Sequence, residues 1–117
     1  MRIGANYLGN QQCEFTVWAP LRQAIAVELD TQPSRLIPLQ PLAAGYWQAQ
    51  VEAVPPGTHY RYRFDDESSL PDPASYYQPL GVHGPSAVID PSFEWTDAAW
   101  QGRPLETMII YEVHVGT

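Results

Sequence analysis

Three consecutive acids, Asp65, Asp66 and Glu67, are the residues whose type and spacing best suit hydrolytic chemistry. Hydrolysis of a glycosidic bond with retention needs two carboxyl groups about 5–5.5 Å apart across the scissile bond. Here the acids stand between a predicted strand and Ser68-Ser69, where adjacent acidic residues are typical of a solvated turn. We therefore assign the three carboxylates to a turn and expect no catalytic residue among them.

A second combination, Asp72 with Ser75, His83 and Ser86, contains the residue types of a Ser-His-Asp hydrolase. The nucleophile of one large class of such enzymes lies in a G-x-S-x-G turn, which this sequence lacks. The segment is rich in proline, and Asp and Ser side chains in such segments commonly bond to the nearby backbone. We interpret Asp72 and both serines as turn residues.

Metal and cofactor chemistry finds no candidate residues in this sequence. The histidines His59, His83 and His114 lack the spacing of metal ligands, and the single cysteine, Cys13, cannot complete a zinc site or form an intramolecular disulfide. The sequence contains no lysine for Schiff-base or P-loop chemistry. We expect no metal and no cofactor.

Four aromatic residues could contact a sugar, because an aromatic ring packs on the C–H-rich face of glucose. Trp18 and Tyr46 fall on the polar side of their predicted strands, and Tyr76 and Tyr77 lie in a long loop. Aromatic residues at the interface between two domains show the same pattern. We favour the interface and keep glucan contact as the alternative.

The elements that position these residues are short strands with alternating hydrophobicity. Trp47, Ala49 and Val51 share one face, and Tyr60, Tyr62 and Phe64 share another, so both sets are predicted core. The strands recur every 8–12 residues with turn signals between them. This pattern predicts an all-β, immunoglobulin-like antiparallel β-sandwich of the early-set type. The predicted strands cover residues 14–18, 24–29, 35–39, 45–51, 58–65 and 86–90.

The sandwich is predicted over residues 1–100, with a long loop at 71–86 and one helical turn capped by Thr96 near its end. A linker follows at 101–107. The near-continuous apolar run in 108–115 is typical of a strand buried on both faces of a parallel sheet. We expect residues 108–117 to begin a truncated (β/α)8 barrel.

His114 lies on this last predicted strand, at a spacing of two residues from Glu112. Residues at the carboxyl ends of barrel strands approach the active site, which makes His114 a fifth candidate for substrate contact. A polar residue inside a barrel more often bonds to neighbouring strands, and that alternative stays open.

Charge and composition exclude several classes of partner. The 117 residues carry a net charge of −7, with no basic stripe for a phosphate backbone or an anionic membrane, so we expect neither partner. A neutral sugar is compatible with this charge. No run approaches the ~20 apolar residues of a membrane span, and no signal-peptide core is present. We expect a cytoplasmic protein.

The segment Phe15-Thr-Val-Trp-Ala-Pro20 resembles the N-terminal domains of α-glucan enzymes in glycoside hydrolase family 13. Val27-Glu-Leu29, Gly45-Tyr-Trp47 and Pro56-Gly57 with the following tyrosines are similar to later parts of the same domain. The resemblance implies an isoamylase-type, branching or trehalohydrolase enzyme, with this chain as its non-catalytic N-terminal domain.

Three further segments resemble the maltooligosyltrehalose trehalohydrolases within this family. They are Pro71-Asp-Pro-Ala-Ser75, Gln78-Pro-Leu-Gly-Val-His-Gly-Pro-Ser86 and Tyr111-Glu-Val-His-Val-Gly-Thr117. The resemblance implies hydrolysis of the α-1,4 bond beside the terminal trehalose unit of maltooligosyl trehalose. It also implies an aspartate nucleophile and a glutamate acid/base beyond Thr117, on the domain's own barrel partner. The alternatives are a branching or debranching enzyme and an autonomous glucan-binding module.

Overall fold

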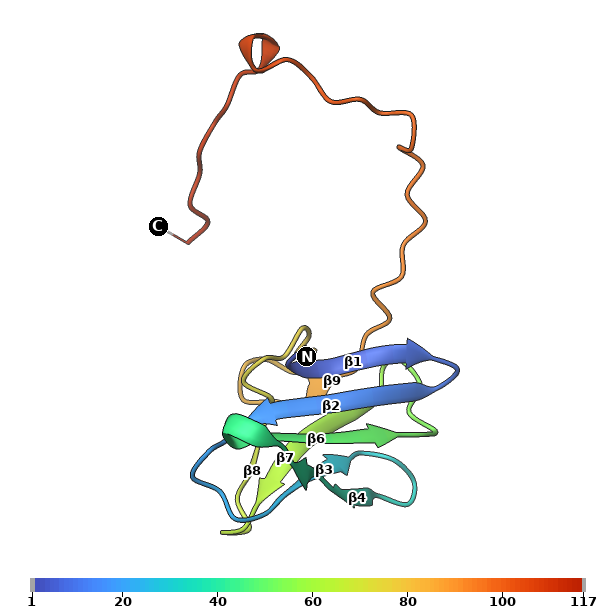
Figure 1. The fold of residues 1–117 in the computed structure, drawn as a ribbon, viewed down its shortest axis with the longest axis vertical. Helices are drawn as coiled ribbons and strands as arrows, with labels where there is room; N and C mark the ends of the chain where they lie inside the picture. Colours follow the sequence, from blue (N-terminus) through green and yellow to red (C-terminus); the bar gives the residue numbers. More distant parts are fainter. Residues whose placement is uncertain (1, 117) are drawn as a thin grey trace.

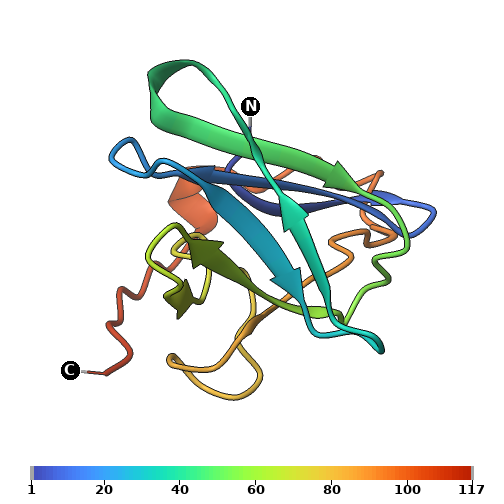
Figure 2. The same ribbon diagram turned by 90° about the horizontal axis from the view of Figure 1, so that it is seen from below.

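Two antiparallel sheets of short strands form the body of the protein, described by a computed structural model over residues 2–116. One sheet has the order β1-β2-β6-β5, and the other has the order β4-β3-β7-β8 with β9 also paired to β7. The two sheets lie as two layers (Figures 1 and 2). The strands are β1 (Gly4–Gly9), β2 (Gln12–Trp18), β3 (Ile25–Leu29), β4 (Arg35–Pro38), β5 (Gln40–Pro41), β6 (Tyr46–Val51), β7 (His59–Phe64), β8 (Ser69–Leu70) and β9 (Ser86–Ala87), with 3-10 turns η1 (Ala43–Gly45) and η2 (Leu105–Thr107).

The core fills the space between the two sheets, and alternation along each strand decides which side chains enter it. On β7, Tyr60 and Tyr62 are almost fully buried, as predicted from the sequence. Phe15 of β2 meets Tyr60 edge to face, with ring centroids 5.0 Å apart. Val27, Leu29, Val54, Val88 and Cys13 are also fully enclosed.

Three residues predicted for the core are only partly buried and pack against its margin: Ala49 and the two large aromatic residues Trp47 and Phe64. Phe64 is the last residue of β7, and the guanidinium of Arg22 lies 4.6 Å from its ring centroid. The Trp47 indole N–H donates to the Ala19 carbonyl at 3.2 Å. The alternation of polar and apolar residues therefore predicted the correct face of the strand for both aromatic residues. How deeply each is buried depends on where the opposite sheet ends.

Most of the predicted strands are present, and three additional ones are found. β1, β5 and β8 were not predicted, because two of them have only two residues and β1 begins and ends at glycine. The predicted last strand at 86–90 is shortened to β9. The predicted helical turn capped by Thr96 is wrong: Trp100 N–H bonds to the Asp97 carbonyl in a simple turn.

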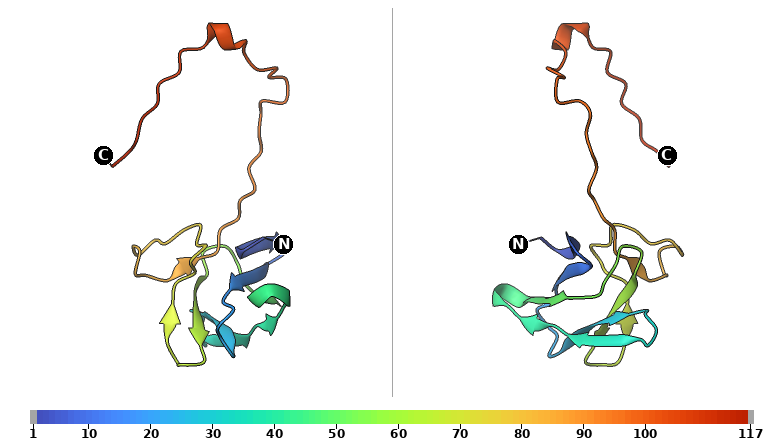
Figure 3. Two further views of the ribbon diagram at one scale, coloured as in Figure 1. Left: turned by 60° about the vertical axis from the view of Figure 1, so that its left-hand side comes forward. Right: turned by 90° about the vertical axis from the view of Figure 1, so that its right-hand side faces the viewer.

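Beyond the sandwich, residues 92–116 extend away as a tail, which Figure 3 shows from two sides. Within the described part of this tail, residues 108–116 form no strand, and Ile109 is 100% exposed. The predicted strand at 108–115 therefore has no structural counterpart here. A parallel strand requires a neighbour for its hydrogen bonds, and no neighbouring strand lies beside this segment in the structure.

Deleting residues 107–117 should leave the free energy of unfolding nearly unchanged, because the side chains of residues 107–116 are exposed. The same deletion should reduce self-association, since an uncovered apolar segment recruits other exposed edges. Urea denaturation and sedimentation velocity measure the two effects. Unfolding of the shortened chain would instead show that residues 108–115 belong to the sandwich.

Candidate functional site

A buried carboxylate, Asp72, stands at the start of the long loop and joins it to the core. Asp72 is 4% exposed, and its Oδ2 accepts hydrogen bonds from the hydroxyls of Tyr60 at 2.7 Å and Tyr62 at 3.4 Å. Its Oδ1 accepts from the Ala74 backbone N–H at 2.8 Å, and its own N–H donates to Ser86 Oγ at 3.0 Å. The network therefore fastens both ends of the loop to β7.

Burial controls the titration of this network. Desolvation raises the pKa of Asp72, although the Tyr60 hydroxyl and the Ala74 N–H oppose that rise. Desolvation, reinforced by the nearby Asp72 charge, also raises the pKa values of Tyr60 and Tyr62 well above 10. The tyrosines stay protonated as donors, so the network is suited to holding the loop rather than to moving protons.

The four residues with the types of a Ser-His-Asp hydrolase do not come together as one site. Asp72 and Ser86 are neighbours, but the Ser75 hydroxyl donates to the Tyr77 carbonyl at 3.1 Å. His83 is exposed, and its carbonyl accepts from Arg61 at 2.9 Å. Turn bonding accounts for Ser75 as predicted and for Oδ1 of Asp72. The other carboxylate oxygen of Asp72 and the Ser86 hydroxyl belong instead to the buried network.

The acidic cluster lies in the turn between β7 and β8, as the sequence analysis proposed. The Arg22 guanidinium pairs with Asp65 at 3.1 Å and with Asp66 at 2.7 Å. A hydrogen bond from the Gln23 backbone N–H lowers the pKa of Asp65, and one from the Ser68 hydroxyl lowers that of Asp66. A general acid needs a raised pKa, so both shifts oppose glycosidase chemistry here.

Trp18, at the end of β2, presents a fixed aromatic ring to solvent. Its side chain is 58% exposed, and its indole N–H donates to the Ala44 carbonyl at 3.0 Å. Tyr46 lies directly opposite on β6. A pocket of about 270 Å³ adjoins the Trp18 ring and continues to Asp72 and Ala74. The hydrogen bond holds the indole in place, and the exposed ring borders space that a ligand could fill.

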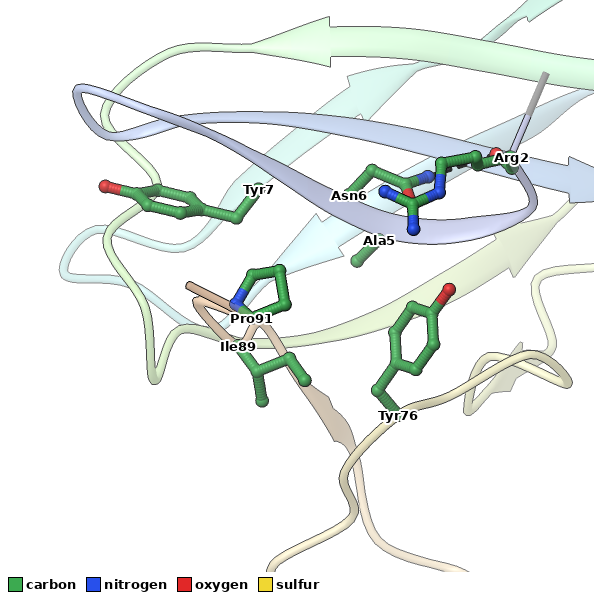
Figure 4. A pocket seen from close by; sticks show the side chains of 7 residues that line it. All are labelled: Arg2, Ala5, Asn6, Tyr7, Tyr76, Ile89 and Pro91. Carbon is green, nitrogen blue, oxygen red and sulfur yellow. Dashed lines mark hydrogen bonds between the residues drawn. The ribbon is translucent and has the colours of Figure 1, made fainter. Parts of the chain in front are cut away.

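The two loop tyrosines occupy a different surface from this pocket. Tyr76 is 58% exposed and Tyr77 is 55% exposed. Tyr76 lines a separate pocket of about 90 Å³ beside β1, together with Tyr7 and Pro91 (Figure 4). The five predicted contact residues are therefore divided among three places, since His114 is exposed in the tail beyond η2.

Among residues 2–116, no group of three His, Cys, Asp or Glu side chains could hold a metal ion. The same part of the chain contains no helix long and apolar enough to cross a membrane.

A family model for carbohydrate-binding module 48, the isoamylase N-terminal domain, matches residues 2–91. The chain belongs to this family. The matched range spans the whole sandwich and ends where the tail begins. The aromatic surfaces and the buried Asp72 network are therefore features of a module 48 domain.

Two curated relatives have different activities. The malto-oligosyltrehalose trehalohydrolase of Saccharolobus solfataricus is 38% identical over 103 residues, which are 88% of this chain and 18% of that enzyme. The 1,4-alpha-glucan branching enzyme of Deinococcus radiodurans is 35% identical over 93% of this chain and 17% of that enzyme. The chain thus spans less than a fifth of the length of either relative.

A solved structure extends the likeness into the tail of this module 48 chain. The crystal structure of a Salmonella typhimurium protein assigned as an alpha amylase is 34% identical and has a TM-score of 0.82. The match covers 98% of this chain and 19% of that protein. The sandwich and most of the tail therefore follow a course already seen in a much longer protein.

The Asp72 network is the feature that sequence reasoning missed, although a signal for it was present. Tyr60 and Tyr62 were placed on the inner face of their strand, and a buried tyrosine hydroxyl usually finds a hydrogen-bond partner. Asp72, which lies 12 residues after Tyr60 and between two prolines, is that partner in the structure.

Proposed function

We propose that this chain is the non-catalytic N-terminal domain of a malto-oligosyltrehalose trehalohydrolase. The parent enzyme would hydrolyse the α-1,4 bond beside the terminal trehalose unit of maltooligosyl trehalose. The observation that carries this proposal is 38% identity to such an enzyme over 88% of the chain. The acidic turn supports a non-catalytic role, because Asp65 and Asp66 pair with Arg22 and have lowered pKa values.

Catalysis would then belong to the rest of the parent chain. The proposal includes a (β/α)8 barrel after this immunoglobulin-like, early-set sandwich, with residues 108–115 as its first strand. The exposed apolar side chains of that segment would be covered by the neighbouring strands and helices of the barrel. A retaining mechanism would use an aspartate and a glutamate there, about 5–5.5 Å apart.

The alternative parent is a branching enzyme, because the Deinococcus radiodurans enzyme is 35% identical over 93% of the chain. The overall sequence identities to the trehalohydrolase and to the branching enzyme are similar, 38% and 35%. The segment from Gln78 to Ser86 favours the trehalohydrolase, since its complete pattern resembles that group. In the structure this segment is a defined loop, with Gln78 Nε2 donating to the Val82 carbonyl at 3.0 Å.

We expect the longer protein to release trehalose from maltooligosyl trehalose, whereas the 117-residue chain should release none. The isolated chain offers no carboxylate pair suited to acid/base and nucleophilic roles. Chromatography of the released sugars measures both outcomes under the same conditions. New α-1,6 branches in place of trehalose would show a branching enzyme, and turnover by the short chain would contradict the non-catalytic assignment.

A second role, glucan contact at the Trp18 surface, has its own supporting observation. The pocket of about 270 Å³ beside Trp18 is near the lower end of the roughly 300–1,000 Å³ of small-molecule sites. Because the hydrogen bond to Ala44 already fixes the Trp18 ring, stacking against a sugar would cost little conformational entropy. We assign glucan contact to Trp18 and to Tyr46, which lies opposite it on β6.

A further inference from the structure

The small pocket beside β1 lies where the chain leaves the sandwich. Its walls include the rings of Tyr7 and Tyr76, which stand on either side of Ile89 and Pro91 in Figure 4, and the lining also contains Arg2 and Asn6. The buried Ala5 contributes to its lining from β1. The pocket therefore joins three separate parts of the chain at the root of the tail.

The size of this pocket decides what it can hold. Its volume of about 90 Å³ is far below the roughly 300–1,000 Å³ of small-molecule sites. It is also smaller than an apolar cavity of about 150 Å³ that accepts benzene. A sugar ring is too large for such a space, whereas one aliphatic side chain fits it.

The pocket is preformed, because β1 and the loop are in close contact behind Tyr76. A Cβ atom added to Gly4 would lie 2.9 Å from the Ala74 carbonyl oxygen and 3.5 Å from the Tyr76 ring. Gly4 also has a φ of +90°, which side-chain-bearing residues rarely adopt. The Tyr76 wall is thus held against the strand before any partner arrives.

The surroundings of the pocket are those of a surface that is covered in the complete protein. β1 is an edge strand of its sheet, and Ile3 and Leu8 beside it are about half exposed. Phe93 and Trp95, just beyond Pro91, form an edge-to-face pair with centroids 4.8 Å apart and are largely exposed. Soluble proteins usually cover sheet edges and apolar groups gathered in this way.

We propose that this pocket receives an apolar side chain from the remainder of the parent chain and so docks the sandwich onto it. The tail begins at Pro91, which keeps the rest of the parent close to the pocket. The chain spans 18% of a trehalohydrolase relative, so most of the parent is available as the partner. The occupant is thus a side chain of the parent itself, and this inference rests on the proposed function.

The likeness to the Salmonella typhimurium protein supports the same occupant. The match has a TM-score of 0.82 and covers 98% of this chain, so it includes the tail as well as the sandwich. In that protein the matched part is 19% of a longer chain. A similar sandwich and exit are thus found in a protein whose remaining chain is available to dock beside them.

Hydroxyl-radical footprinting read by mass spectrometry tests the docking. Tyr76 should be modified several-fold more slowly in the full-length protein than in the 117-residue chain. Trp18, which we assign to glucan contact, should react at similar rates in both when no sugar is present. Equal rates for Tyr76 in the two chains would overturn the proposal. Slow reaction of Tyr76 in a self-associated 117-residue chain would also overturn it, because the occupant would then be a second copy.

Two exposed tyrosines provide a matched pair of variants for the full-length protein. Tyr76→Ala removes a wall of the pocket and should accelerate proteolysis of tail residues 92–107 several-fold. Tyr77→Ala, next to it but outside the pocket lining, should leave the cleavage rate unchanged. Equal rates for the two variants would overturn the proposal. Trehalose release by the unmodified protein is assayed separately, so failure of the proposed activity is distinguishable from failure of the docking.

Discussion

Replacing Phe15 with alanine is expected to lower the free energy of unfolding by about 3–5 kcal/mol, the usual range for large aromatic truncations in a core. Phe15 is 0% exposed and its ring meets Tyr60 between the two sheets, so the surrounding strands cannot close the space that it leaves. A domain with a total stability of about 5–15 kcal/mol would lose much of its folded population. Urea denaturation followed by circular dichroism measures the change.

Phe93→Ala is the matched control, because it removes the same atoms from a side chain that is 68% exposed. Its effect should remain within about 0.5 kcal/mol, as for most surface substitutions. If both variants lost the same stability, the division into a packed sandwich and an uncovered tail would be wrong.

Asp72→Ala should lower the free energy of unfolding by about 2–4 kcal/mol, since an unsatisfied buried polar group costs about 1–3 kcal/mol. The substitution leaves the Tyr60 and Tyr62 hydroxyls without their acceptor and releases the loop from β7. Denaturation of Asp97→Ala, an exposed acid in the tail, gives the comparison and should change stability by less than about 0.5 kcal/mol. Similar losses for both variants would contradict a structural role for the buried carboxylate.

Because burial shifts the pKa of Asp72, the stability that this carboxyl group contributes depends on pH. Burial raises the folded-state pKa above its usual 3.8, so the folded state binds the proton more tightly than the unfolded state. The stability from this group is present below pH 3.8 and is lost as the pH rises through the folded-state pKa. Asp65, Asp66 and Asp90 have lowered pKa values and lose their contribution as the pH falls. Relative to Asp72→Asn, the natural chain should therefore gain stability on mild acidification.

The sandwich was predictable wherever a strand had one apolar face and one polar face. β7 shows this most clearly, because Tyr60 and Tyr62 alternate with arginines and were placed correctly. β1 was missed because its burial depends on pairing with β2 rather than on alternation along its own sequence. Residues 108–115 form no strand in this chain, since an apolar run becomes a buried strand only when neighbouring strands are present.

The candidate site was predictable in part. Trp18 falls on the polar side of its strand, and this position correctly predicted an exposed ring. The sequence could not show that Trp18 and Tyr76 belong to different pockets, because the loop's course depends on the Asp72 network and on the contact of Gly4 with Ala74. These are long-range contacts, and no local pattern in a single sequence encodes them.

Titration of the 117-residue chain with a linear maltooligosaccharide, followed by the indole N–H resonances in NMR spectra, tests the role of the sandwich most directly. We predict saturable shifts of the Trp18 indole resonance, while that of Trp95, 74% exposed in the tail, stays unchanged. Trp18→Ala should abolish binding, and Trp95→Ala should leave it intact. If the Trp18 resonance remained fixed at saturating sugar, or both variants bound equally well, glucan contact at this surface would be contradicted.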